Sequence, residues 1–513
     1  MHTHPGITPG IVRAIAVAIV VALVVPATVA SASVSPTEDL AAQGAVFVPD
    51  AYEPDDRPDE AYAYDPSRDG NTFTSFRTFH GTDGVVADER DVVMVLADTA
   101  GTPIWIETAY LDGWYDTRVT VRDEVGTVLR VFDDNDFFRS TYSESAHFTA
   151  PAAGAYTVTV EDISGYPFAY ELHITVGCAR RVAGADRFAT AAAVARLQWD
   201  NTANPYYGAG YGPQHIVVAN GFNPADALGG GALAARLGGV LLLTETGRLP
   251  DATRDEIVRI AESRFWSYDD VTVHVLGGTA AVADAVISEL EGIRYVSSVE
   301  RIAGGDRYST AAEIATVTSA RVGVGTTAFL VNGSAWPDAL AVAPVAAQEG
   351  APVLMTLATV VPQVTLDWLK DHGVTDVVVV GGEGVVSAGV YESLDASYRM
   401  RRISGETRYE TARAVAAYGV QACGMDGTLA TLASGEEFAD ALAAAPIAWW
   451  TGAPLLLTRP DTLHPEVASY FDNAGAIGQV AEDGIGCYVL GGPSAVSDTA
   501  YAAFRDLWRS FAP

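Results

Sequence analysis

The sequence predicts a multidomain protein in which an N-terminal antiparallel β-sandwich precedes three tandem α/β repeats with parallel sheets. Residues 50–176 alternate Val, Thr, Tyr and Phe with polar residues, which is the period of half-buried strands. From residue 178 onward, short Val/Leu runs alternate with Ala-rich stretches, the pattern of parallel strands that helices cover on both faces. This second pattern occurs three times, so each occurrence is expected to be a small domain.

Residues 1–32 are predicted to be a secretory signal peptide. Arg13 precedes an apolar run over residues 14–25, and Pro26 and the small-residue site 30–32 follow it. The alternative is an uncleaved anchor, but the run is shorter than the roughly 20 residues that a spanning helix needs. We therefore expect a mature chain from near Ser33 without membrane insertion, in which residues 33–49 form a flexible tether.

The formal net charge of −33 disfavours nucleic acid and acidic membranes as partners. An anionic partner must therefore meet a local basic site or bridging cations. Lys370 is the only lysine, which removes a phosphate-loop lysine from consideration.

The predicted sandwich, residues 50–176, contains strands such as Thr117-Arg-Val-Thr-Val-Arg and Ala155-Tyr-Thr-Val-Thr-Val. Within it, Asp133-Asp-Asn-Asp136 offers oxygens to calcium but lacks the Gly and the terminal Glu of the helix-loop-helix calcium motif. We interpret it as a solvated acidic turn and predict no metal site.

The three repeats, residues 178–297, 298–398 and 399–513, open alike. The openings are Arg181-Val-Ala-Gly-Ala-Asp-Arg-Phe-Ala-Thr-Ala, Arg301-Ile-Ala-Gly-Gly-Asp-Arg-Tyr-Ser-Thr-Ala and Arg402-Ile-Ser-Gly-Glu-Thr-Arg-Tyr-Glu-Thr-Ala. Gly184, Gly304 and Gly405 mark a period of 120 and then 101 residues. That period is too long for a solenoid coil, and three whole units predict a closed set.

Later elements recur in the same order in each repeat. An Asp-Ala-Leu segment begins at Asp226, Asp338 and Asp440; a buried strand ends in Leu-Leu-Thr or Leu-Met-Thr; and a Gly-Gly pair follows at 277–278, 381–382 and 491–492. The glycines stand at the carboxyl end of a strand, where open parallel sheets bind ligands, although close strand-to-helix packing also explains them.

The openings, together with Asp-Ala-Leu, Leu-Leu-Thr and Leu-Gly-Gly, resemble the type-2 cell-wall-binding repeat family of Gram-positive surface proteins. The resemblance implies a non-covalent anchor that holds secreted proteins at the cell surface on anionic secondary cell-wall polymers, with three modules packed in a pseudo-threefold arrangement. Residues 50–176, with Asp50-Ala-Tyr-Glu-Pro-Asp-Asp and Gly154-Ala-Tyr-Thr-Val-Thr-Val, resemble the bacterial pre-peptidase C-terminal domain.

Six arginines are the candidate polymer-binding residues: Arg181, Arg301, Arg402, Arg187, Arg307 and Arg408. The last three fall in the first turn of an expected helix, where backbone N–H groups and a guanidinium can receive a phosphate or carboxylate. The alternative is an internal salt bridge to the Asp of Asp-Ala-Leu. Thr190, Thr310 and Thr411, three residues further on, are expected to bond within their own helix.

Cys423 and Cys487 each precede an expected strand of the last repeat and form a possible disulfide, which leaves Cys178 over. Gly-x-Ser-x-Gly, His-Glu-x-x-His and Cys-x-x-Cys are absent, so no catalytic residues, cofactors or enzyme activity are predicted. Two alternatives stay open: a secreted hydrolase with an unrecognised site in one diverged repeat, and a self-assembling surface-layer component.

Overall fold

The computed structural model describes residues 62–64, 72–78, 90–97, 102–110, 117–133, 145–162, 169–176, 179–200, 212–263, 271–473 and 487–509. The predicted signal peptide, the tether, Cys178 and residues 134–136 of the acidic turn lie outside these residues. Within them, none of the helices combines the length and the apolar character that crossing a membrane requires.

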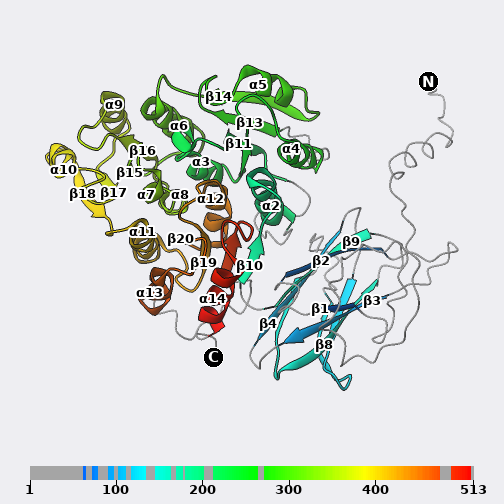
Figure 1. The fold of residues 1–513 in the computed structure, drawn as a ribbon. Coiled ribbons are helices and arrows are strands. Elements are labelled where there is room, and N and C mark those ends of the chain that lie inside the picture. The colour runs from blue at the N-terminus through cyan, green and yellow to red at the C-terminus, as the bar shows by residue number, and fades with distance from the viewer. Residues whose placement is uncertain are drawn as a thin grey trace, which may run out of the picture. The chain divides into compact units, whose positions relative to one another are not determined.

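The N-terminal region contains two sheets, both mainly antiparallel (Figure 1). The five-stranded sheet has the order β1 (Tyr62–Tyr64), β3 (Arg90–Ala97), β8 (Gly154–Asp162), β5 (Thr117–Arg122) and β6 (Val128–Asp133). The four-stranded sheet has the order β2 (Thr72–Thr78), β9 (Ala169–Val176), β4 (Pro103–Tyr110) and β7 (Ser145–Thr149).

Alternation along these strands produces their shared core. Val93 and Val95 of β3, Ile104 and Ile106 of β4, and Val158 of β8 are fully buried members of one cluster. Every second side chain of a strand points to the same face, so apolar residues at alternate positions unite the two sheets around one core. The mainly antiparallel strands agree with the sequence prediction, and the complete β-sandwich stays a prediction.

The remaining chain forms three parallel four-stranded sheets, each with its own helices. The first unit has the strand order β12 (Val240–Thr244), β11 (His215–Asn220), β13 (Val271–Leu276) and β14 (Val296–Ile302). Its helices are α2 (Arg187–Asp200), η1 (Pro224–Asp226), α3 (Gly230–Arg236), α4 (Asp251–Ser263) and α5 (Asp284–Glu291).

The second unit has the strand order β16 (Val353–Thr356), β15 (Thr327–Asn332), β17 (Asp376–Val380) and β18 (Arg399–Ile403), with helices α6 (Arg307–Val322), α7 (Trp336–Ala339), α8 (Val342–Glu349), α9 (Gln363–Asp371) and α10 (Ala388–Asp395). The third unit has the order β20 (Leu455–Thr458), β19 (Ala430–Ser434), β21 (Cys487–Leu490) and β10 (Ala179–Val182), with helices α11 (Arg408–Cys423), α12 (Ala439–Thr451), α13 (Pro465–Asn473) and α14 (Asp498–Arg509). The predicted α/β repeats with parallel sheets are confirmed.

The strand that opens each repeat in the sequence pairs in the sheet of another unit. Strand β14 joins β13 of the first unit, and β18 joins β17 of the second. Strand β10, at the start of the first repeat, joins β21 near the end of the third, with Ala179 opposite Cys487. The three units therefore form a closed set, because the first strand of the series completes the last sheet.

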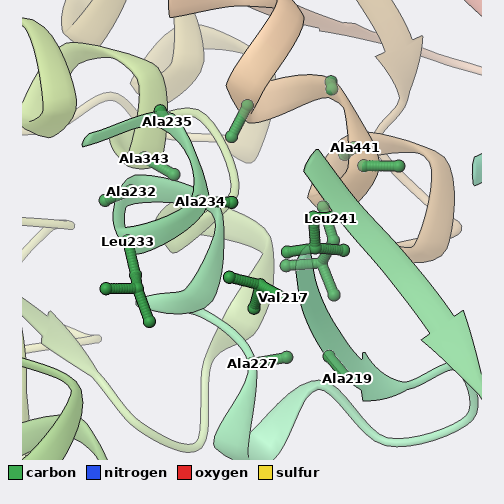
Figure 2. Close-up of a cluster of buried hydrophobic side chains, with 14 of the residues drawn as sticks. Val217, Ala219, Ala227, Ala232, Leu233, Ala234, Ala235, Leu241, Ala343 and Ala441 are labelled. Carbon is green, nitrogen blue, oxygen red and sulfur yellow. The ribbon is translucent and has the colours of Figure 1, made fainter. Parts of the chain in front are cut away.

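Helices α3, α8 and α12 contact one another in pairs, and small residues make this possible. A Cβ atom added to Gly231 of α3 would lie 2.6 Å from Cβ of Ala445 on α12 and 3.2 Å from Cβ of Ala343 on α8. Figure 2 shows Ala343 beside the alanines of α3. The three residues each lie three positions after the Leu of Asp-Ala-Leu, so equivalent positions of the three units meet in one core cluster.

Candidate functional site at the unit junctions

Each opening motif folds into a tight turn that leads into a helix. The backbone N–H groups of Gly184, Gly304 and Gly405 donate to the hydroxyl groups of Thr190, Thr310 and Thr411, at 3.0, 3.1 and 3.1 Å. The three threonines are buried, but each hydroxyl accepts from the turn before the helix. The prediction that they bond within their own helix therefore misplaced the partner.

Helix caps then orient the arginine that follows. Asp306 and Thr407 cap α6 and α11 through reciprocal bonds with Ser309 and Glu410, and Asp186 accepts from the N–H of Ala189 at 2.8 Å. Side-chain acceptors satisfy N–H groups that a helix start leaves unpaired. Arg187, Arg307 and Arg408 consequently occupy the first position of their helices.

The first arginine of each motif binds inside the fold. Nη1 of Arg181 donates to the carbonyls of Gly491 and Val496, and Arg301 and Arg402 bind the corresponding carbonyls of the first and second units. Burial lowers the pKa of Arg181, against the attraction of Tyr501 and Asp498. These contacts give Arg181, Arg301 and Arg402 a structural role inside the fold, and their predicted contact with a polymer stays a prediction.

The second arginine of each motif begins a helix that contacts another unit: α2 contacts α12, α6 contacts η1, and α11 contacts α7. Nη1 of Arg187, Arg307 and Arg408 donates to the carbonyl of Gly221, Gly333 and Gly435, at 2.6, 2.7 and 2.6 Å. These carbonyls follow the central strands β11, β15 and β19, so all three arginines stand at the carboxyl edge of the sheets.

Two of these arginines also contact the neighbouring unit. The guanidinium of Arg408 lies 5.7 Å from the ring centroid of Trp336 in the second unit. That of Arg187 lies 5.9 Å from the ring of Phe438 and 3.8 Å from Glu437 in the third. The helix of one unit thus packs against the Asp-Ala-Leu loop of another.

The carboxylates of Asp-Ala-Leu face the same junctions. Burial raises the pKa of Asp440 to about 6, Arg187 opposes this shift, and Glu437 adds to it. Burial also raises the pKa of Asp338, against a hydrogen bond with Thr411 and the charge of Arg408. The internal partner that the sequence suggested for the arginines therefore exists as an electrostatic neighbour across a unit boundary.

The first glycine of each Gly-Gly pair packs closely against the aspartate of the same unit. The first glycine of each pair has a positive φ, +94° at Gly277, +108° at Gly381 and +100° at Gly491. A Cβ atom at these positions would lie 2.3 to 3.3 Å from Oδ2 of the aspartate in the same unit. Close packing therefore explains the first glycine of each pair. It does not explain the second, because no atom lies closer than 3.9 Å to the position of a Cβ on Gly278, Gly382 or Gly492.

A pocket of about 950 Å³ opens between the second and third units. Asp338 and Gly382 line it from the second unit, and Arg408, Tyr409 and Arg459 from the third. Sequence reasoning missed Arg459, although its place directly after Leu-Leu-Thr, where the other repeats carry Glu245 and Leu357, distinguishes the third repeat.

The predicted disulfide does not form. Cys423 ends α11 with its Sγ 3.6 Å from a carboxylate oxygen of Glu349, and burial and that carboxylate raise its pKa to about 12. Cys487 is buried at the start of β21 in a different core cluster. The two cysteines belong to different packing environments, and no bond joins them.

Across the described ranges, no group of three or more His, Cys, Asp or Glu is arranged to hold a metal.

Two curated proteins are similar to this chain in sequence. N-acetylmuramoyl-L-alanine amidase LytC of Bacillus subtilis (strain 168) is 30% identical over 284 residues, 55% of this chain and 51% of that protein. The amidase enhancer of the same organism is 26% identical over 284 residues, 55% of this chain and 35% of its own. The chain thus spans about half or less of the length of these relatives.

Solved structures match as well. Cwp8 from Clostridium difficile is 24% identical, with a TM-score of 0.53 over 65% of this chain and 52% of that one, which supports the fold. A pre-peptidase C-terminal domain of collagenase from Bacillus anthracis is 21% identical over 23% of this chain and 98% of that one, with a TM-score of 0.18, and adds no argument on the N-terminal fold.

The family described as cell wall binding domain 2 (CWB2) matches residues 181–287, 301–391 and 402–501. These matched ranges cover all three repeats and more than half of the chain. The protein therefore belongs to the cell wall binding domain 2 family.

Proposed function

We propose that the three unit junctions hold this protein on an anionic secondary polymer of the cell wall without a covalent bond. The observation that supports this most directly is the recurrence of Arg187, Arg307 and Arg408 at the same edge of three sheets. Family membership already locates the protein outside the cell, at the cell wall. The polymer, the arginines as its ligands and the pseudo-threefold arrangement are parts of the proposal.

The electrostatics of the junctions favour an anionic ligand despite the acidic chain. A backbone carbonyl binds Nη1 of each arginine and so orders the guanidinium, and a guanidinium has further donors that can bind an anionic group. The carboxyl edge of a parallel sheet is also where such folds bind ligands. Three similar sites on a repetitive polymer gain affinity through effective concentration, so each site alone can be weak.

Co-sedimentation with purified cell walls tests this function. The chain from residue 33 is mixed with walls before and after removal of their secondary polymers, at low and at high salt. We expect it to pellet with intact walls, to stay in solution with stripped walls, and to be released by salt, which screens exposed charges. Equal pelleting with both wall preparations would contradict the polymer, and no pelleting with either would contradict wall binding itself.

Catalysis is the second candidate function, and the third unit is where it would reside. Tyr409 beside the pocket stacks on His464, with ring centroids 4.1 Å apart, and the other repeats have Pro250 and Pro362 in place of this histidine. A relative named as an amidase is a further reason to test this chain for catalysis. Incubation with intact walls should release no new amino or reducing groups if binding is the whole function; release that His464→Ala abolishes would establish an enzyme.

A further inference from the structure

One position differs in charge among the three units although the fold places it identically. Thr244, Thr356 and Thr458 end the edge strands β12, β16 and β20, opposite Asn220, Asn332 and Ser434 of the central strands. The next residue is Glu245 in the first unit, Leu357 in the second and Arg459 in the third. The same place at the carboxyl edge is thus acidic, apolar or basic.

In the third unit this position brings a second cation to the pocket. Arg408 and Arg459 both line the cavity of about 950 Å³. Both also act on the hydroxyl of Tyr409, where they oppose the rise in its pKa that burial and Glu436 cause. Arg459 is exposed, and within the described ranges its guanidinium forms no hydrogen bond and no ion pair within 4.0 Å. The pocket therefore holds one ordered guanidinium and one that is available.

The other two junctions lack this pair. At the position of Arg459, the first unit has Glu245, which binds Arg248 at 2.7 Å, and its junction arginine, Arg187, lies 3.8 Å from Glu437. The second unit has Leu357 there, 43% exposed. A single guanidinium beside a carboxylate or an apolar side chain holds an anion less well than two converging guanidiniums.

We propose that the pocket between the second and third units is the principal anion-binding site, in which Arg408 and Arg459 together receive one phosphate or carboxylate group of the polymer. This inference rests on the proposed function and deepens it. Asp338, Glu406 and Glu436 line the same pocket, so they favour a repeating unit whose anionic group is flanked by hydroxyl or ammonium donors. The other two junctions mainly join the units and add weaker contacts.

Exchange of residues between units tests this inequality. Arg459→Leu copies the second unit and Arg459→Glu copies the first. Because Arg459→Leu removes a charged hydrogen-bond donor, we expect it to weaken binding to intact walls about tenfold or more, and Arg459→Glu to weaken it further. Leu357→Arg, which gives the first–second junction its second cation, should tighten binding.

Arg399→Leu is the matched control. It removes the same charge from a side chain that is 78% exposed. Arg399 lies at the amino end of β18, whereas the pocket lies at the carboxyl edge of the sheets. We expect less than about a twofold change from it, since screening limits the effect of a distant exposed charge. Equal midpoints of thermal unfolding for all variants would establish that folding is unchanged.

The outcomes separate the inference from the function on which it rests. If the wild-type chain does not bind walls, both fail. If it binds walls and Arg459→Leu binds as tightly as Arg399→Leu, the inequality of the sites is overturned and wall binding stands. Glycerol phosphate oligomers and polygalacturonate, titrated against the wild type and Arg459→Leu, distinguish a phosphate from a carboxylate ligand; loss of Arg459 should weaken the preferred probe only.

Discussion

The turn before helix α6 is built on a glycine that has no room for a side chain. A Cβ atom on Gly304 would lie 2.4 Å from the side chain of Ser309, whereas nothing lies within 4 Å of the position of a Cβ on Gly305. The close approach lets the N–H of Gly304 reach Thr310 and sets the direction in which Arg307 leaves the turn. A methyl group at residue 304 therefore disturbs both the packing and the junction arginine.

Gly304→Ala should lower the free energy of unfolding by about 1–3 kcal/mol, the usual cost of an added methyl group in a closely packed place. Gly305→Ala is the neighbouring control and should be nearly neutral. Thermal midpoints of the two variants check this. Equal midpoints for both variants and the wild type would mean that the turn relaxes easily, contrary to the packing seen here.

Asp440 is the buried carboxyl group that faces Arg187 across the junction of the third and first units. Its pKa in the folded protein is about 6, against an ordinary value of 3.8, chiefly because it is buried. A raised carboxyl pKa means that the folded chain holds the proton more tightly than the unfolded chain does. The stabilisation from this group is therefore complete below pH 3.8 and is lost as the pH rises through about 6.

Asp440→Asn removes this pH dependence because the amide does not ionise. At 1.36 kcal/mol for each pKa unit, we expect the variant to be more stable than the wild type by on the order of 2–3 kcal/mol at pH 7, and by little at pH 4. Thermal midpoints measured between pH 4 and 8 test the expectation. Parallel curves for variant and wild type would show that Asp440 is not the source.

At the scale of residues, the sequence identifies which positions recur in the three repeats. It does not identify which groups their side chains contact. Identical spacing in three repeats identifies Arg181, Arg187 and Thr190 as a group. Only the structure shows that Arg181 binds carbonyls inside the fold while Arg187 faces a neighbouring unit. Arg459 could not be predicted from the shared motifs because its significance lies in a difference between the repeats.

At the scale of elements, the periodicity predicts that strands and helices alternate but does not determine which sheet a strand joins. Strand β10 belongs by sequence to the first repeat and by hydrogen bonding to the sheet of the third unit. Pairing register depends on contacts between residues more than 300 positions apart, such as Arg181 with Gly491. Local sequence patterns carry no record of such contacts.

Arg181→Met should therefore loosen the third unit, although Arg181 belongs by sequence to the first repeat, whose helix α2 begins at Arg187. The substitution keeps the length of the side chain and leaves the carbonyls of Gly491 and Val496 without their donor, which costs about 1–3 kcal/mol for each buried group. Hydrogen exchange should quicken in residues 487–509 and stay unchanged in 215–263. Arg301→Met is the control and should quicken exchange in 271–302.

If Arg181→Met instead quickened exchange in helix α2 and left β21 protected, β10 would belong to the first unit. The closed set of three units would then be contradicted, because it depends on the pairing of β10 with β21.

At the scale of the molecule, the three units behave as one body because they share a core. Helices α3, α8 and α12 meet at Gly231, Ala343 and Ala445, and one buried cluster runs through all three units. The recurring motifs predict three repeats, whereas the contact of α3, α8 and α12 depends on small residues whose partners lie in other units. This shared core holds the three junctions at fixed positions relative to one another.

Hydrogen exchange of the whole chain, with and without soluble polymer released from cell walls, tests the central claim most directly. If the polymer binds at the carboxyl edge of the sheets, protection should appear in the loops 333–338, 405–409 and 435–440, strongest around the pocket of Arg408 and Arg459. Protection confined to strands of residues 90–176, or to the opposite ends of the parallel sheets, would contradict it.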